Sequence, residues 1–359
     1  MRLFVVAAPG LEGVLGAEVR ALAGVSDVAD VPGGVEMTAG REGLARANLW
    51  LRTATRVVVR LGAVEAHDFA RLRKRAAALP WEELVAPGAR VEPAVTVRRC
   101  RLYHTGAIAE RIVGAASDRL GADAGAVEHA VRVTVRGEDD RFVLSVDSSG
   151  ELLHRRGWRT EAGAAPLRET LAAGVLLLAG YDGAEPLLDP TCGAGTFVVE
   201  AAAIATGRAP GLGRSFAFER FPGHDAALLE RLRAEAAAAV RAPAAPIAGS
   251  DADAAVLEFA RRNAERAGVA GAVTLTVAAV ETLRPAGPPG LVVANPPYGH
   301  RLDAAVALYR TLGRFARAGG HRLALLASDE KLLRAAGRPR AIFPLVNGGL
   351  RASLALYGH

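Results

Sequence analysis

The stretch from residue 186 to residue 204 constrains the fold of this chain more than any other. Pro186-Leu187-Leu188-Asp189 reads as a short buried strand, and the residues from Phe197 to Ile204 are apolar with helical spacing. Gly193 and Gly195 lie between them, where glycine permits unusual dihedral angles and lets a ligand approach bare backbone. The sequence therefore predicts a strand, a glycine-rich turn and a helix, the unit from which mainly parallel α/β sheets are built.

The residues around this turn favour a ligand with a positively charged amino group. A dinucleotide fingerprint needs a third glycine where this chain has Val198, and the lysine of a phosphate-binding loop is absent. Asp189 would repel a pyrophosphate but attract an amine, and S-adenosylmethionine carries both an amine and a sulfonium. We therefore expect this cofactor to contact Asp189, Thr191, Cys192, Gly193, Gly195 and Thr196.

A second acidic group follows the next apolar segment, Ile247-Ala248-Gly249-Ser250. In doubly wound sheets, an acidic side chain at the end of the second strand accepts hydrogen bonds from the ribose hydroxyls. Ser250 and Asp251 are therefore candidate cofactor contacts. Asp253 is expected to cap a helix from Ala254 to about Arg266, and plain capping is also the alternative for Asp251.

The tetrapeptide Asn295-Pro296-Pro297-Tyr298 follows the apolar run from Leu291 to Ala294. Asn295 Oδ1 and the Pro296 carbonyl can accept both hydrogens of a planar amine, which directs the nitrogen lone pair toward an incoming methyl group. Pro297 stiffens the backbone, and Tyr298 offers a face on which a base stacks for roughly 1–3 kcal/mol. The bland alternative is an ordinary turn after a buried strand.

The rest of the C-terminal half alternates strands near Leu187, Ile247, Val273, Leu291 and Leu323 with helices. This alternation predicts a mostly parallel sheet. The apolar segments on either side of Asn347-Gly348-Gly349 predict a terminal antiparallel hairpin, because Asn and Gly tolerate positive φ angles.

The N-terminal half reads as a mixture of strands and helices. We expect a helix from Gly10 to Ala23, a strand around Val35, a helix from Arg41 to Leu51, a basic helix ending near Pro80 and a helix from Thr105 to Leu120. The basic residues in this half are Arg41, Arg46, Arg52, Arg56, Arg60, Arg71, Arg73, Lys74, Arg75, Arg98, Arg99 and Arg101.

Basic charge indicates a polyanionic partner. The formal net charge is +6 with a pI near 9.9, and arginine suits contacts with phosphates and bases. Collectively these residues favour RNA, with Arg71, Arg73, Lys74 and Arg75 as substrate contacts. For each residue alone, a solvated helix face is the alternative.

Length and composition are consistent with a multi-domain cytoplasmic enzyme. The 359 residues have room for two or three domains, and no segment approaches the ~20 consecutive apolar residues that span a bilayer. Met1 to Ala8 reads as a first strand and not as an export signal. Cys100 and Cys192 provide neither a disulfide framework nor a metal cluster, so we expect no metal.

The chain resembles a known family, the THUMP-domain class I methyltransferases that modify guanine N2 in RNA, and within it the bacterial 23S rRNA enzymes. The resemblance rests on residues 156–159 (Arg-Gly-Trp-Arg), 165–173, 189–196, 200–202, 210–212 (Pro-Gly-Leu), 214–219 and 295–302.

This resemblance implies an α/β chain with a Rossmann-like class I methyltransferase domain, a mostly parallel seven-stranded sheet with a C-terminal antiparallel hairpin, at residues 166–359. It further implies a ferredoxin-like domain at 1–63, a THUMP RNA-binding domain at 64–150 and a linker at 151–165. S-adenosylmethionine is the implied cofactor, with Val280 near the adenine, and Arg301 is a candidate contact to the guanine or a phosphate.

Two positions depart from the family pattern. Ala279 stands where such enzymes often carry an aspartate for the adenine amine, and His300 replaces a glutamate. Three alternatives stay open: a guanine-N2 methyltransferase of tRNA, a DNA adenine-N6 methyltransferase, which shares the Asn-Pro-Pro-Tyr sequence, and a non-catalytic RNA-binding protein.

Overall fold

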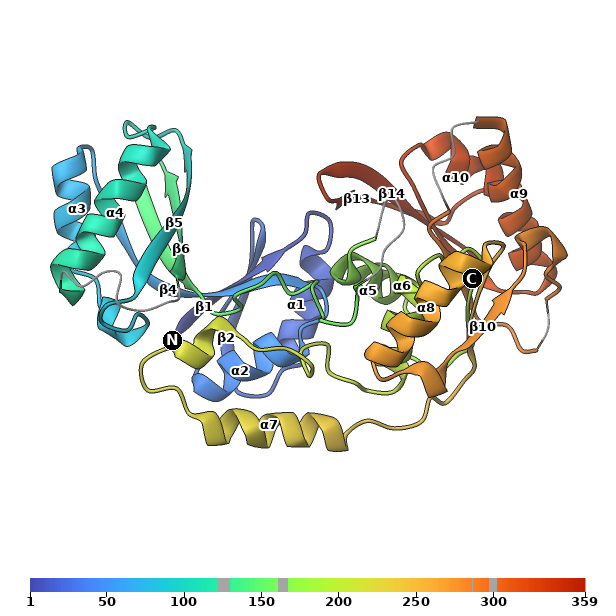
Figure 1. The fold of residues 1–359 in the computed structure, drawn as a ribbon. Helices are drawn as coiled ribbons and strands as arrows, with labels where there is room; N and C mark the ends of the chain where they lie inside the picture. The colour runs from blue at the N-terminus through green and yellow to red at the C-terminus, as the bar shows by residue number, and fades with distance from the viewer. Residues whose placement is uncertain (122–129, 161–166, 286, 297–301, 359) are drawn as a thin grey trace.

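The computed structural model describes residues 1–121, 130–160, 167–285, 287–296 and 302–358. These residues form two seven-stranded sheets, one in each half of the chain, with helices packed against them. Figure 1 shows the two halves side by side, with helix α7 (Ala226–Ala238) along the lower edge.

The first sheet has the strand order β2-β3-β1-β4-β7-β6-β5. Its central strand β4 (Ala54–Glu65) pairs antiparallel with β1 on one side and with β7 on the other. The division expected between residues 63 and 64 remains a prediction, and it falls within this shared strand. The other elements of this half are β1 (Arg2–Ala7), α1 (Glu12–Arg20), β2 (Val25–Val31), β3 (Gly34–Ala39), α2 (Arg41–Trp50), α3 (Phe69–Ala77), β5 (Arg90–Arg98), α4 (Thr105–Leu120), β6 (Ala130–Glu138) and β7 (Arg141–Asp147).

The second sheet has the order β10-β9-β8-β11-β12-β14-β13. Its first five strands are parallel, and β13 and β14 form the antiparallel hairpin that the sequence predicts. Its strands are β8 (Leu187–Asp189), β9 (Ile247–Asp251), β10 (Thr274–Val277), β11 (Leu291–Ala294), β12 (Arg322–Ala327), β13 (Ala341–Asn347) and β14 (Leu350–Tyr357).

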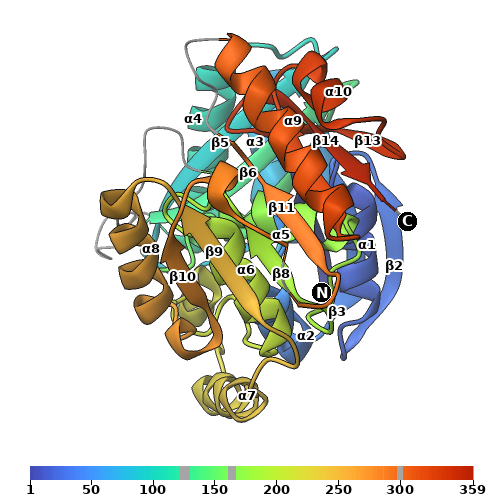
Figure 2. The same cartoon turned by 90° about the vertical axis from the view of Figure 1, so that its right-hand side faces the viewer.

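Helices cover both faces of this second sheet (Figure 2). Helices α5 (Glu169–Leu178), α6 (Thr196–Ala205) and α8 (Ala254–Arg266) share one apolar core with Leu187, Ile247 and Val293. Helices α9 (Leu302–Ala318) and α10 (Glu330–Ala336) form a second core with the opposite face. The central strand β11 is buried throughout because both faces of the sheet are covered there.

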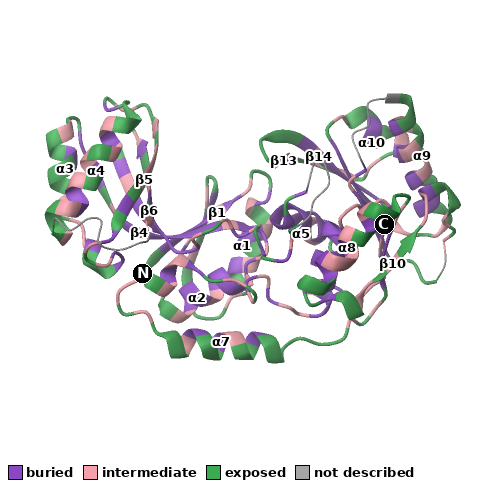
Figure 3. Ribbon diagram, viewed as in Figure 1, coloured by how far each residue is buried: buried purple, intermediate pink, exposed green. Residues whose placement is uncertain are grey.

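The segment from residue 207 to residue 240 leaves the second sheet and packs against the N-terminal half. Phe216, Phe218, Leu229 and Leu232 belong to the core of the first sheet. The Gly211 amide donates to the Leu49 carbonyl over 2.9 Å. Figure 3 shows buried residues on one side of α7 and exposed residues on its outer side. This segment therefore ties the two halves together.

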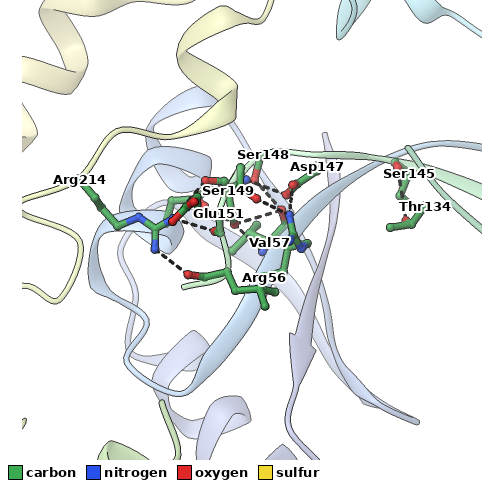
Figure 4. A network of polar contacts seen from close by, with 12 residues as sticks. Arg56, Val57, Thr134, Ser145, Asp147, Ser148, Ser149, Glu151 and Arg214 are labelled. Atoms are coloured by element: carbon green, nitrogen blue, oxygen red, sulfur yellow. Dashed lines mark hydrogen bonds and ion pairs between the residues drawn. The ribbon is translucent and has the colours of Figure 1, made fainter. Parts of the chain in front are cut away.

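A buried polar network reinforces the same junction (Figure 4). Arg56 of β4 forms an ion pair with the buried Asp147 and donates to the Gly150 carbonyl. From the other half, Arg214 donates to the carbonyls of Leu152 and Glu151. Because a buried charge needs a partner, Arg56 belongs to the fold and not to an RNA-facing surface.

Candidate cofactor and active site

Three of the predicted site residues lie at one edge of the second sheet. Asp189 ends β8, Asp251 ends β9 and Asn295 follows β11. Leu188 is aligned with Ala248 on one side and with Val292 on the other, so these carboxyl ends are level with one another. The chain order reverses between β8 and β11, as Figure 2 shows, and open α/β sheets bind ligands at such a reversal.

Hydrogen bonds fix the glycine turn after β8. The Cys192 amide donates to the Ser250 carbonyl over 2.9 Å, and the Gly195 amide donates to the Cys192 carbonyl over 2.8 Å. Gly193 and Gly195 have φ angles of +53° and +84°. A Cβ added at Gly195 would lie 3.0 Å from the Ala260 Cβ of α8, whereas one added at Gly193 would have no neighbour closer than 3.9 Å. Gly195 is thus required by packing, and Gly193 leaves backbone open.

Gly195→Ala is expected to lower the free energy of unfolding by about 1–3 kcal/mol. The positive φ angle and the close approach of α8 both oppose a side chain at this position. The urea midpoint of the purified variant measures the loss. Gly213→Ala is the control, because nothing lies within 4 Å of its added Cβ. Equal midpoints for the two variants would contradict this description of the turn.

Asp251 joins the turn to the second strand. Its Oδ2 accepts from the Gly193 amide over 2.9 Å, and its Oδ1 accepts from the Asp253 amide over 3.0 Å. Asp253, in contrast, accepts from the Ala255 and Val256 amides and caps α8, as predicted. The capping alternative for Asp251 is therefore wrong. Each carboxylate oxygen of Asp251 retains a lone pair for a ligand hydroxyl.

Asp189 is buried beside the turn, and no cationic side chain of the described residues pairs with it. Within the described residues its carboxyl accepts one hydrogen bond, from the Thr191 amide at 3.1 Å. Burial raises the pKa of Asp189 from 3.8 to about 8, with a smaller contribution from the charge of Asp251. An ammonium group near this carboxyl would favour its ionised form.

This pKa shift predicts that cofactor binding releases a proton near neutral pH. The folded chain holds a proton on Asp189 that the unfolded chain has lost, so the free energy of unfolding falls as pH rises from 3.8 to about 8. A bound ammonium group favours the ionised form of the Asp189 carboxyl, so binding expels that proton. Calorimetry of S-adenosylmethionine binding in buffers of different ionisation heat should detect the release at about one pH unit below 8. Asp189→Asn should abolish it, and a wild type without buffer dependence would refute the assignment.

Two orphaned polar atoms also fit a cofactor here. Thr191 Oγ1 and Ser250 Oγ are buried and have no hydrogen-bond partner within the described residues. Leaving a buried hydroxyl unpaired costs about 1–3 kcal/mol, which a polar ligand can recover. The carboxyl of Asp189, the carboxylate of Asp251 and these hydroxyls match the amine, ribose and polar groups of S-adenosylmethionine.

The structure places the other predicted contacts as follows. Cys192 is buried against β9, and burial raises the pKa of its thiol well above the usual range, which disfavours a nucleophilic thiolate. Thr196 begins α6, and its hydroxyl accepts from Arg159 over 2.7 Å. Val280 is buried beyond β10. Asn295 is partly exposed and Pro296 is buried after β11. Pro297, Tyr298 and Arg301 lie outside the described residues.

Two supporting residues were not among the predicted site residues. Asn263, on the buried side of α8, donates to the Ala194 carbonyl over 3.0 Å and so supports the glycine turn. Arg159 contacts Glu169 over 2.9 Å and donates to Thr196. The sequence signal for Asn263 is an amide side chain on the apolar face of a predicted helix. Arg159 belongs to the motif at residues 156–159, to which no role was assigned from the sequence.

The basic residues of the N-terminal half separate into two groups. Arg71, Arg73, Lys74 and Arg75 are exposed on α3, although Arg73 donates two hydrogen bonds of 2.7 Å to Asp118. Arg52 is directed inward instead, and it donates to the carbonyls of Ala203 and Arg208 in the other half. Fewer basic side chains are therefore available to a polyanion than the count of arginines and lysines in the sequence indicates.

Within the described residues, no helix is long and apolar enough to cross a membrane. The same residues contain no group of three or more His, Cys, Asp or Glu side chains arranged to hold a metal ion.

The fold and the site define a class I S-adenosylmethionine-dependent methyltransferase. Counted from β8, the strand order of the second sheet is 3-2-1-4-5-7-6, with the glycine turn after the first strand and an acid after the second. The chain belongs to the methyltransferase family described as UPF0020, RMKL-like, methyltransferase domain, whose model matches residues 156–348. A second model, the RlmL ferredoxin-like domain, matches residues 2–58.

Solved structures support this assignment over the whole chain. SMU.472, a protein assigned as a methyltransferase and solved with SAH, is 31% identical with a TM-score of 0.90, over 100% of this chain and 98% of its own. A Listeria monocytogenes protein, assigned by prediction as an N6-adenine-specific DNA methylase, is 30% identical with a TM-score of 0.91, over 99% and 95%. TrmN from Thermus thermophilus, at 23% identity and a TM-score of 0.76 over 99% of each chain, shares the fold.

Proposed function

We propose that this methyltransferase modifies the exocyclic N2 of a guanine in RNA, and specifically in 23S rRNA. The observation that carries the proposal is the position of Asn295 and Pro296 at the carboxyl end of β11, level with the glycine turn after β8. The two residues supply an amide oxygen and a carbonyl beside a site suited to a methyl donor. That pairing is what alkylation of a planar amine requires.

S-adenosylmethionine supplies an electrophilic methyl group. Asn295 Oδ1 and the Pro296 carbonyl accept the two N2 hydrogens, which directs the nitrogen lone pair away from the ring and toward that methyl group. A guanine must first leave its stack at a cost of a few kcal/mol, and Tyr298 is the proposed stacking partner. As the N–C bond forms, the S–CH3 bond would break and S-adenosylhomocysteine would leave with its electron pair; the cationic nitrogen then loses its proton to water. No strong base is needed, so positioning carries most of the rate.

The N-terminal half supports RNA as the substrate. The match to the RlmL ferredoxin-like domain and the exposed basic helix α3 are features that a DNA methyltransferase does not need. We assign residues 64–150 as a THUMP domain that holds RNA through phosphate contacts, in the cytoplasm. Phosphate contacts position a nucleic acid without reading its sequence.

Mass mapping of N2-methylguanosine tests the substrate directly. In a strain that lacks the gene, rRNA should lose one such mark, and the wild-type gene should restore it. Loss of a tRNA mark with intact rRNA would redirect the proposal to tRNA. Unchanged modification in both RNAs would overturn it.

A second candidate, adenine-N6 methylation of DNA, is favoured by one finding. The 30%-identical Listeria monocytogenes protein carries that assignment. Adenine N6 presents the same kind of amine to an Asn-Pro-Pro-Tyr sequence. Transfer of labelled methyl groups to DNA and not to RNA would favour this candidate, whereas an absence of any S-adenosylmethionine binding would favour a non-catalytic protein.

A further inference from the structure

Two sequence motifs without a role in methyl transfer meet around one cavity. The motif at residues 156–159 and the segment Leu167–Glu169 line a cavity of about 490 Å³. Its lining residues are Glu151, His154, Arg155, Arg156, Gly157, Arg159, Leu167, Arg168 and Glu169. Four arginines around one cavity are unusual unless an anion binds there or every guanidinium has a partner.

Three of the four arginines have carboxylate partners, and one does not. Arg156 pairs with the buried Glu200 at 3.4 Å, and Arg159 pairs with Glu169 at 2.9 Å. The Arg168 side chain is exposed and forms no ion pair or hydrogen bond with the described part of the chain. Among the described residues, no carboxylate therefore compensates its charge at the cavity.

Arg155, the third arginine with a carboxylate partner, is held only loosely. Arg155 contacts Glu151 over 3.1 Å, and both side chains are more than 60% exposed, at 63% and 66%. An exposed ion pair of this kind contributes about 0–1 kcal/mol, so a phosphate can displace the glutamate at little cost. Arg155 and Arg168 are therefore the two guanidinium groups available to a ligand.

The histidine in the cavity reports the same positive field. The pKa of His154 is lowered to about 4, first by burial and then by Arg168, Arg155, Arg156 and Arg159. His154 is thus neutral at physiological pH and adds a hydrogen-bonding ring without charge. Two carboxylates, Glu151 and Glu169, line the cavity against four arginines, so its net charge is positive.

The cavity lies beside the cofactor turn and between the two halves of the protein. Arg159 reaches from the cavity to the Thr196 hydroxyl, at the first residue of α6 after the turn. Residues 151–159 lead from the last strand of the first sheet toward α5 in the second half (Figure 1). A strand of RNA held by the first half and entering the active site would pass this region.

We propose that this cavity binds one phosphate of the RNA backbone, through Arg168 and Arg155, close to the nucleotide that is methylated. The inference rests on the proposed function. Arginine suits the task because its planar fork can form two parallel hydrogen bonds to a phosphate. Such a contact fixes the register of the strand and is independent of base identity.

Salt dependence of RNA binding by Arg168→Gln tests the site. The full-length protein is titrated into a fluorescently labelled single-stranded rRNA fragment at a series of NaCl concentrations. Loss of one phosphate contact should lower the slope of log Kd against log[NaCl] by about 0.7. S-adenosylmethionine affinity should stay unchanged. Arg310→Gln, at an exposed position of α9 on the opposite side of the sheet, removes the same charge and should keep the wild-type slope.

The outcomes separate this site from the proposed function. Equal slopes for wild type and Arg168→Gln, with methyl transfer to RNA retained, would overturn the phosphate site alone. A reduced slope for Arg168→Gln, together with no methyl transfer to RNA by the wild type, would overturn the proposed function and leave an anion site. A third arm adds inorganic phosphate at constant ionic strength. If phosphate binds wild type and not Arg168→Gln while the RNA slopes agree, the cavity takes free phosphate, and the RNA assignment fails.

Discussion

Asn295→Ala is expected to lower the rate of methyl transfer to RNA by about 10²–10³-fold. Asn295 lies at the end of β11, level with the cofactor turn, where its Oδ1 is assigned to orient the amine. Its removal takes away an interaction that strengthens as the nitrogen becomes cationic, so kcat and kcat/KM should fall together. Single-turnover assays with labelled S-adenosylmethionine measure the effect.

Two further measurements define what the Asn295 result means. Affinity for S-adenosylmethionine should stay within a few fold, because the assigned cofactor contacts lie on β8 and β9. Asn295→Asp keeps acceptor oxygens at the same position and should retain more activity than Asn295→Ala. An alanine variant with wild-type turnover would remove this residue from the mechanism.

Asp251→Ala is expected to weaken S-adenosylmethionine binding roughly 10²-fold, because hydrogen bonds to charged groups contribute about 1.5–3 kcal/mol each. The variant loses the assigned ribose acceptor and also the carboxylate that holds the Gly193 amide at 2.9 Å. Calorimetry with S-adenosylmethionine measures the change in Kd.

Asp253→Ala is the matched control for this prediction. Asp253 lies two residues away and caps α8, so its loss should cost about 0.5–2 kcal/mol of stability. Its effect on cofactor affinity should be far smaller. Equal losses of cofactor affinity in the two variants would show that Asp251, like Asp253, acts by stabilising the fold and not by contacting the cofactor.

Local sequence patterns predicted the elements that depend on local physics. The helices expected from Thr105 to Leu120 and from Ala254 to about Arg266 are found at those bounds. The expected helix from Gly10 to Ala23 is shorter, at Glu12–Arg20, because Gly10 forms a turn with a φ angle of +89°. Strand β2 was missed, since only every third residue faces inward and a bulge interrupts its pairing.

Long-range packing was not readable from the sequence. The segment 207–240 belongs to the methyltransferase match, yet its Phe216 and Leu232 complete the core of the first sheet. Arg56 was counted toward a basic surface, but it pairs with Asp147, 91 residues away. A periodic pattern shows that a side chain is buried or charged and does not show its distant partner.

The candidate site was predictable where residues end strands of the parallel sheet. Asp189, Gly193 and Asp251 were each proposed from a strand end or a glycine turn. In the structure the Gly193 amide donates to Asp251, and Asp189 contacts the same turn through the Thr191 amide. Asn263 and Arg159 reach the turn from α8 and from the segment before α5. Their contacts depend on how the helices pack, which no local pattern specifies.

Identification of the methylated nucleoside tests the proposed activity most directly. The purified protein and tritium-labelled S-adenosylmethionine are incubated in three separate reactions, with rRNA from a strain lacking the gene, with tRNA or with DNA. Each nucleic acid is then digested to nucleosides. We predict label in N2-methylguanosine from rRNA, and none with Asn295→Ala. Label in N6-methyladenine from DNA would contradict the assignment of the amine.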